Sequence, residues 1–306
     1  MRPKTSISAT EPDIRLPIGA RGVSKAREIL FGAMLLSIVC AVACTGCSRG
    51  QTQSASGAYR TIRLRSTIRL PVILIEGSPS ELDSQSRIDV LAIVAGGSDE
   101  LPQGPGSFAV MDDGSYLVAD PVRKRLAIYD SKGSYRSQWP IGFAAGSVSE
   151  ITRGLYRVVD AQSSDEHVYD DQGRSVSAVP AAAQPPLEAM LTSPTQGVIT
   201  GGQPGKQIKV ILQSGTERLI SLQPLSTGGN GAVYVAMEVG ASGGESISVS
   251  KRVRKYSPGG ELISEVTDIP LDYYLVPNDE LRLDKDVLYQ MAPSRTEIRM
   301  NSWDMK

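Results

Sequence analysis

The chain has 306 residues, of which 41% are hydrophobic and 21% charged, and its net charge is −1. This composition excludes the disordered and fibrous classes, and the near-neutral balance disfavours nucleic acid as a partner. A content of 30 glycines and 19 prolines, with few aromatic residues, favours an all-β fold rich in turns.

The three cysteines, Cys40, Cys44 and Cys47, are confined to a short stretch near the N-terminus. The rest of the sequence has no cysteine. It therefore contains no disulfide framework, no cysteine-ligated metal and no cysteine nucleophile.

Residues 29–48, ILFGAMLLSIVCAVACTGCS, carry no charge, and basic residues precede them at Arg21, Lys25 and Arg27. This pattern predicts a secretion signal or a membrane-anchor helix, with the basic segment 1–28 retained inside. Residues 49–59 are mostly small and polar, as expected of a flexible tether. We therefore expect one domain, residues 60–306, to be membrane-anchored in the cell envelope and outside the cytoplasm.

The end of the apolar run resembles the lipobox of bacterial lipoproteins, in which small residues precede a cysteine that is lipidated. Cys47 follows Thr45 and Gly46 and fits best, and Cys44 is the second candidate. The departure is Cys44 itself, which stands three residues before Cys47 where the family has Leu or a similar aliphatic residue. An uncleaved anchor and a plain cleavable signal remain alternatives.

Residues 104–141 read as four short strands with a turn signal between each pair. The predicted strands are Phe108–Met111, Tyr116–Ala119, Arg125–Tyr129 and Ser134–Trp139. Aspartate, proline and glycine in the intervening segments are the residues that tight turns require.

Parts of this pattern recur along the chain. Six positions separate Gly114 from Asp120 and Gly154 from Asp160, and four separate Tyr129 from Gly133 and Tyr169 from Gly173. Looser copies begin at Gly197, Gly231 and Asp286, so successive units start 34 to 55 residues apart. This period is typical of β-propeller blades.

With these motifs the chain resembles NHL-type and related six-bladed β-propellers over roughly residues 60–303. The resemblance implies an all-β propeller of five to six four-stranded blades. The last unit lacks an outer strand, and Arg87–Val94 is the predicted N-terminal donor that closes the ring. Arg60–Arg65 and Thr67–Ile75 are further strands that complete a sixth blade or pack beside it. A β-sandwich would also show many short strands, but it does not explain the recurring intervals.

Few residues are candidates for catalysis. The one histidine, His167, is predicted to lie on a strand surface, and we find no assembled catalytic set. Acidic pairs such as Asp112-Asp113 fit tight turns better than a calcium site. Asp120 and Asp160 recur at the end of a second strand, where they brace the following loop or line the mouth of the propeller.

The loops between second and third strands share, by this resemblance, the face through which propellers bind. Two connections are long there, 238–250 and 268–280. The predicted binding residues are Asp120, Arg123, Arg125, Asp160, Lys206, Arg252, Tyr273, Tyr274 and Arg295. Arginine, tyrosine and Gly/Ser-rich loops suit recognition of a protein or polar ligand, although exposed basic residues can equally serve only to solvate a rim.

We therefore expect a non-catalytic propeller that binds a partner protein, peptide or glycan as a monomeric body, without a cofactor or a resident metal. The alternative is a metal-dependent propeller hydrolase or lyase with carboxylates around a central channel, which requires a divalent ion such as calcium. A purely structural part of an envelope complex is a third hypothesis.

Overall fold

The computed structural model describes residues 59–77, 87–177, 187–201, 207–228, 230–243 and 246–306. The predicted basic segment, the signal or anchor helix, its candidate lipidation sites Cys47 and Cys44, and most of the tether lie outside these residues. Within the described ranges the structure consists of strands and turns, and it contains no helix that could cross a membrane.

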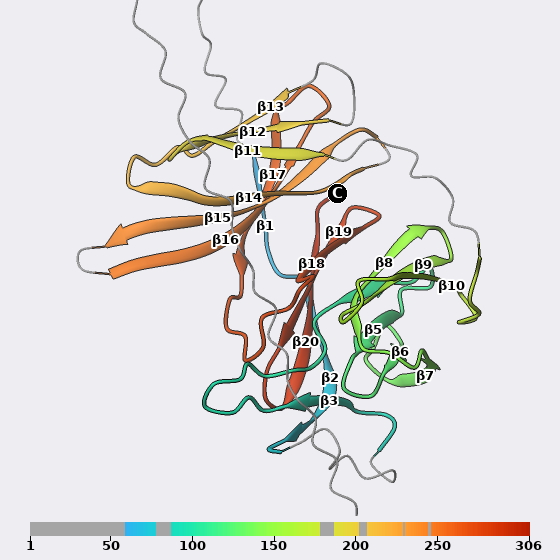
Figure 1. Cartoon of the computed structure of the whole chain (residues 1–306). Coiled ribbons are helices and arrows are strands. Elements are labelled where there is room, and N and C mark those ends of the chain that lie inside the picture. The colour runs from blue at the N-terminus through green and yellow to red at the C-terminus, as the bar shows by residue number, and fades with distance from the viewer. Residues whose placement is uncertain (1–58, 78–86, 178–186, 202–206, 229, 244–245) are drawn as a thin grey trace, which may run out of the picture. The chain divides into compact units, whose positions relative to one another are not determined.

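The strands form five sheets, numbered here along the chain and shown in Figure 1. The first contains β4 (Phe108–Val110), β5 (Tyr116–Asp120), β6 (Arg125–Tyr129) and β7 (Tyr135–Pro140). The second contains β8 (Ala145–Thr152), β9 (Leu155–Asp160) and β10 (Glu166–Asp170), and the third β11 (Glu188–Ser193), β12 (Gln196–Thr200) and β13 (Gln207–Ile211). The fourth contains β14 (Glu217–Thr227), β15 (Val233–Gly243), β16 (Ser246–Tyr256) and β17 (Leu262–Ile269), with β1 (Arg60–Ile62) parallel to β17. The fifth contains β18 (Leu281–Asp284), β19 (Val287–Pro293), β20 (Glu297–Asp304), β2 (Ser66–Ile75) and β3 (Leu91–Val94).

The recurring glycines are explained by backbone geometry. Gly114, Gly133, Gly154 and Gly173 all have φ between +73° and +86°, a region that side-chain-bearing residues adopt only with strain. Gly114, Gly133 and Gly154 end tight turns between antiparallel neighbours, and Gly173 ends the turn that leads from β10 to the isolated bridge between Tyr169 and Ser175. The four strands predicted for the first unit are confirmed to within a residue or two. The glycines recur in the sequence because these turns require a positive φ.

Hydrophobic clusters join the sheets face to face. Tyr156 of the second sheet packs in one cluster with Trp139 of the first, and Phe108 of the first sheet packs in another with Met300 of the fifth. Trp303 of the fifth sheet and Tyr234 of the fourth belong to a third cluster. Val235 of the fourth sheet and Val210 of the third belong to a fourth cluster. The sheets thus follow one another in the series second, first, fifth, fourth, third, and the second and third lie apart in Figure 1. This is an all-β, propeller-like arrangement of antiparallel meanders.

The prediction that Arg87–Val94 pairs with the last strand is wrong. The strand that pairs with β20 is β2, antiparallel in the register Ser66↔Ser302 to Pro71↔Glu297. The apolar run predicted for this role supplies β3 instead, which pairs parallel with the second half of β2. All four β3 residues are buried, and Leu91 packs in the cluster between the fifth and first sheets. A strand wedged between two sheets is apolar on both faces, so its hydrophobicity does not identify its pairing partner.

Candidate binding site

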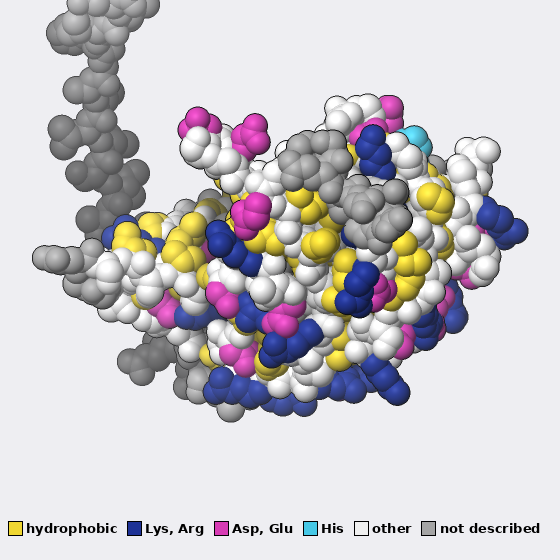
Figure 2. Space-filling view, turned by 90° about the horizontal axis from the view of Figure 1, so that it is seen from below, with side chains coloured by type: hydrophobic (Ala, Val, Ile, Leu, Met, Phe, Trp, Pro, Cys, Tyr) yellow, Lys and Arg dark blue, Asp and Glu magenta, His cyan; other side chains and the backbone are white. Residues whose placement is uncertain are grey.

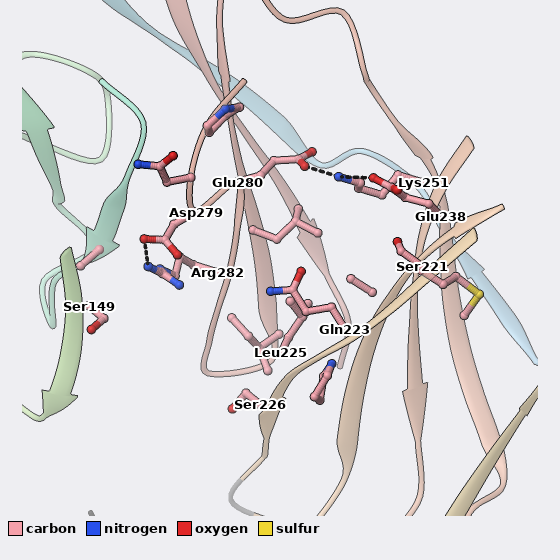
Figure 3. A pocket seen from close by; sticks show the side chains of 18 of the residues that line it. Ser149, Ser221, Gln223, Leu225, Ser226, Glu238, Lys251, Asp279, Glu280 and Arg282 are labelled. Atoms are coloured by element: carbon pink, nitrogen blue, oxygen red, sulfur yellow. Dashed lines mark hydrogen bonds and ion pairs between the residues drawn. The ribbon is translucent and has the colours of Figure 1, made fainter. Parts of the chain in front are cut away.

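A cavity of about 500 Å³ lies where the first strands of the sheets approach one another. Residues of β4, β8, β14, β15, β16 and β18 line it, together with the connection that precedes β18. Figure 3 shows Gln223 and Leu225 of β14 inside this space, with Ser149 of β8 across from them. The lining is mostly polar, which suits a hydrated ligand surface more than an apolar small molecule.

Lys251 lies at one side of the cavity between two carboxylates. Its ammonium group contacts Glu280, and Glu238 Oε1 lies 3.3 Å from its Nζ (Figure 3). The side chains of Lys251 and Glu280 are only 14% and 11% exposed, whereas that of Glu238 is 35% exposed. The lysine is therefore oriented by two carboxylates, of which Glu238 is the more exposed.

Glu280 is also the start of a hydrogen-bond chain that crosses the fifth sheet. Its Oε1 accepts from the Tyr273 hydroxyl and, at 2.7 Å, from Gln290 Nε2. Gln290 Oε1 accepts from Asn301 Nδ2 at 3.0 Å, and Asn301 Oδ1 accepts from Thr67 Oγ1 at 2.8 Å. Burial raises the pKa of Tyr273, and its hydrogen bond to the carboxylate raises it further, so the phenol stays protonated and donates. These contacts hold the Glu280 carboxylate in place from both of its oxygen atoms.

A second charged pair, Asp279 and Arg282, joins the sheets at the opposite side of the cavity. Arg282 Nη2 lies 2.8 Å from Asp279 Oδ2. Figure 3 marks this ion pair with a dashed line. Arg282 also donates to the carbonyl oxygens of Phe108 at 3.1 Å and Val148 at 3.0 Å, and Asp279 accepts from Ser107 Oγ at 2.6 Å. The pair thus clamps the fifth sheet to the first and second, which is a structural role.

The rim of the cavity is apolar where β15 and β16 run beyond the rest of their sheet as a hairpin (Figure 1). The connection 238–250, which the sequence predicts as a loop, is therefore mostly strand. Side chains alternate along a strand, so Ile247 and Val249 share the face of Lys251. Ile247 is 74% exposed and Val249 is 47% exposed.

This apolar face continues onto β14, and one further exposed apolar residue lines the cavity. A Cβ atom at Gly240 would lie 3.0 Å from Ile220 and 3.7 Å from Ile247, so the two isoleucines flank this glycine. Val276, in the connection before β18, is 77% exposed and lines the cavity. Figure 2 shows hydrophobic side chains at the surface of the projecting arm. We call Ile220, Ile247, Val249 and Val276 the apolar rim.

Asp120 and Arg125, predicted as binding residues, are buried. Arg125 Nε lies 3.0 Å from Asp120 Oδ2, and the side chains are 5% and 0% exposed. Arg125 also donates to the carbonyl oxygens of Ile88 and Val90, both at 2.6 Å. Burial raises the pKa of Asp120, and the positive charge of Arg125 opposes the rise. The segment before β3 covers the loop that would otherwise be exposed, so these residues hold the sheet together.

The other predicted residues are dispersed. Arg123 donates to the carbonyl oxygen of Arg87 at 2.8 Å, and Asp160 accepts from the amide of Gln162, a contact that lowers the Asp160 pKa. Arg252 pairs with Glu217 at 2.5 Å, and the Arg295 guanidinium lies 4.7 Å from the ring centre of Tyr274. His167 stacks on Phe143 with ring centres 4.4 Å apart, and Lys206 lies outside the described residues.

Of the eight predicted residues that the structure describes, Tyr273 is the one that belongs to the cavity network through the contacts above. The sequence prediction missed Glu238, Lys251, Glu280 and Arg282 as cavity residues. A usable signal was present, because Glu238 interrupts an otherwise apolar strand, VYVAMEVG. A charged residue in such a run indicates a strand that faces a polar space.

In the described part of the chain, no three histidine, cysteine, aspartate or glutamate side chains converge as a metal site would require. The carboxylates of the cavity are instead paired: Glu238 and Glu280 with Lys251, and Asp279 with Arg282. Glu150 lies apart on β8, where partial burial raises its pKa. The arrangement can orient polar groups of a ligand, and it brings no activated nucleophile to the cavity.

No family model matches the chain, and no curated protein matches it. Among solved structures it is similar to a member of the DUF4221 family from Bacteroides vulgatus, at 9% identity over 80% of this chain and 98% of that one, with a TM-score of 0.30. It is also similar to a gluconolactonase from Xanthomonas campestris, at 9% identity over 65% and 86%, with a TM-score of 0.33. YCF48 bound to D1 peptide matches at 12% identity over 79% and 99%, with a TM-score of 0.28. These scores are low, and the fold assignment rests on the sheet topology described above.

Proposed function

We propose that this protein is an envelope-tethered, non-catalytic β-propeller of five blades that binds a partner protein or peptide through its cavity mouth and apolar rim. The proposal rests on one observation: Ile247 and Val249 lie on the same strand face as Lys251. An exposed apolar surface is therefore adjacent to an oriented lysine side chain. Protein interfaces typically combine an apolar centre with a few fixed polar groups.

A peptide fits this surface better than a glycan because the hairpin also offers backbone groups. The pairing of β16 with β17 begins at Lys251↔Ile269. Among the described residues, Ile247–Ser250 therefore have a strand neighbour only on the β15 side. An extended segment can add to such an edge, with its alternate side chains against Ile247 and Val249.

The rival hypothesis, a metal-dependent hydrolase or lyase, needs carboxylates that converge on a cation. Here each of Glu238, Glu280 and Asp279 lies beside a lysine or arginine, so a cation would have to displace an existing partner. The contacts of the cavity therefore support a binding protein.

Site-specific photo-crosslinking of the full chain in intact cells tests the proposal. A photoreactive residue at Ile247 should give discrete adducts, and the same residue at Met190 on β11, which is 64% exposed, is the matched control. Replacing Val249 with Asp should reduce the Ile247 adduct because it puts a charge into the apolar surface. Absence of a discrete adduct at Ile247, or the same adducts at Met190, would refute the proposed binding face.

We further propose that the segment 29–48 delivers and anchors the protein, with Cys47 as the lipidated residue. Metabolic labelling with a clickable fatty acid should mark the wild-type chain and the Cys44→Ser variant, but not Cys47→Ser. If Cys44→Ser abolishes the label, Cys44 is the acceptor. A chain that is never labelled yet stays in the membrane fraction would indicate an uncleaved anchor.

A further inference from the structure

A second cavity, of about 390 Å³, lies on the outside of the fourth and fifth sheets. It is lined by β1, by the segment that leads to β2, and by the end of β20. Its charged residues are Arg60, Arg63, Arg65, Lys306 and Asp304. We call the four cationic side chains the basic pocket.

The positive charge of the basic pocket is poorly neutralised. Arg60 donates to a main-chain oxygen of Lys306. Arg65 lies 3.8 Å from Asp304, and their side chains are 60% and 42% exposed, so water screens this pair strongly. Within the described residues, no hydrogen bond or ion pair holds the guanidinium of Arg63. Even with a terminal carboxylate on Lys306, cations outnumber anions here.

The backbone that carries the arginines is fixed. β1 pairs with β17, the amide of Leu64 donates to Asp268 Oδ2 at 3.2 Å, and the amide of Arg65 donates to the Ser302 carbonyl at 2.8 Å. Leu64 lies between two arginines and is 42% exposed. The guanidinium groups therefore start from anchored positions, which reduces the entropy lost when they bind a ligand.

The sequence places this pocket next to the predicted membrane tether. Arg60 directly follows segment 49–59, whose end-to-end distance as a flexible chain is about 18 Å. A tether of this length lets the basic side chains reach the membrane surface, where the negative potential of anionic lipids acts over about one Debye length. Guanidinium groups bind phosphate with paired hydrogen bonds, and an exposed leucine between them can enter the interface of the bilayer.

We infer that the basic pocket binds the phosphate of an anionic phospholipid headgroup and so holds the domain against the membrane surface. The inference rests on the proposed membrane tether. The basic pocket would give the domain a second contact with the membrane in addition to that tether. The contact fixes which side of the domain faces the bilayer.

Native mass spectrometry of the full chain in a neutral detergent tests this, with phosphatidylglycerol and phosphatidylcholine added in equal amounts. The wild-type protein should retain phosphatidylglycerol preferentially. Arg63→Gln should reduce the preference about fivefold, since one basic residue near an anionic lipid surface contributes about that factor. The variant Arg60→Gln/Arg63→Gln/Arg65→Gln should abolish the preference.

The matched control is Arg136→Gln/Arg153→Gln/Arg174→Gln, which removes three exposed arginines elsewhere and changes the net charge equally. It should retain the wild-type preference. An equal loss in this control, or no preference in the wild-type protein, would overturn the inference. Retention of inorganic phosphate without any preference for phosphatidylglycerol would assign the pocket to a free anion and overturn the lipid assignment. Membrane fractionation of the same variants tests the tether separately, because the pocket variants should stay in the membrane fraction.

Discussion

Replacing Arg125 with Met should destabilise the protein strongly, because it leaves Asp120 buried without its cation. Asp120 is fully buried, and its Oδ1 atom has no hydrogen-bond partner in the structure, so Arg125 is its main compensation. The carbonyl oxygen of Ile88 loses the Arg125 donor as well, and that of Val90 keeps its second donor, Arg123. Methionine retains much of the aliphatic volume, so the cost is mainly electrostatic. We expect a loss of about 3–5 kcal/mol in the free energy of unfolding.

Urea denaturation at pH 7 measures this loss, and a second variant separates its causes. Asp120→Asn in the Arg125→Met background removes the buried charge, so it should recover about 2 kcal/mol. Arg136→Met, which removes an exposed arginine, should change stability by less than about 0.5 kcal/mol. A loss below about 1 kcal/mol in Arg125→Met, or a double variant no more stable than Arg125→Met, would refute this reasoning.

The pH dependence of Arg125→Met gives an independent check. Burial raises the pKa of Asp120 in the folded state above its unfolded value of about 4. The folded state then binds a proton more tightly than the unfolded state, so stability falls as the pH rises between the two pKa values. The defect of Arg125→Met should therefore shrink as the pH is lowered from 7 towards 4, whereas the double variant should lack this dependence. A defect that is constant with pH would contradict the account.

Two further predictions concern turns. The backbone amide contact that lowers the pKa of Asp113 to about 2 stabilises the folded state above the unfolded pKa, and this contribution is lost as the pH falls from about 4 towards 2. Asp113→Asn should flatten the acid limb of a thermal-stability profile in this range, and an unchanged limb would contradict the assignment. Gly173→Ala should cost clearly more than Gly114→Ala: both positions have positive φ, but a Cβ at Gly173 would lie 2.4 Å from the Trp139 ring. Backbone strain alone costs about 1–2 kcal/mol, so equal melting temperatures for the two variants would refute the clash.

The sequence predicts the local elements well because their signals are local. Gly114 and Gly133 occupy turns whose positive φ favours glycine, so the strands between them are recognisable without the fold. Pairing over long distances is different. Both Thr67–Ile75 and Arg87–Val94 look like strands, and which of them reaches β20 depends on how the sheets pack.

In the candidate site, too, local features are predictable from the sequence and long-range contacts are not. Arg125 looks like an exposed loop residue, but a segment more than 30 positions earlier covers it and accepts its hydrogen bonds. Lys251 and Glu280 meet only because β16 and the start of the fifth sheet face one cavity. No spacing along the chain predicts this contact. Tyr273 and Glu280, in contrast, lie in the same connection, so their proximity is predictable from the sequence.

The pairing of β2 with β20 has a consequence for biogenesis. Residues 66–71 must wait for residues 297–302 before their ladder can form, although they emerge first during synthesis and any export. Until then the first half of β2, STIRLP, lacks its ladder partner, and an unpaired strand of this kind is open to chaperones and proteases. A truncated chain that lacks the last ten residues would keep this segment open permanently. The ladder can therefore close only after synthesis has passed residue 302.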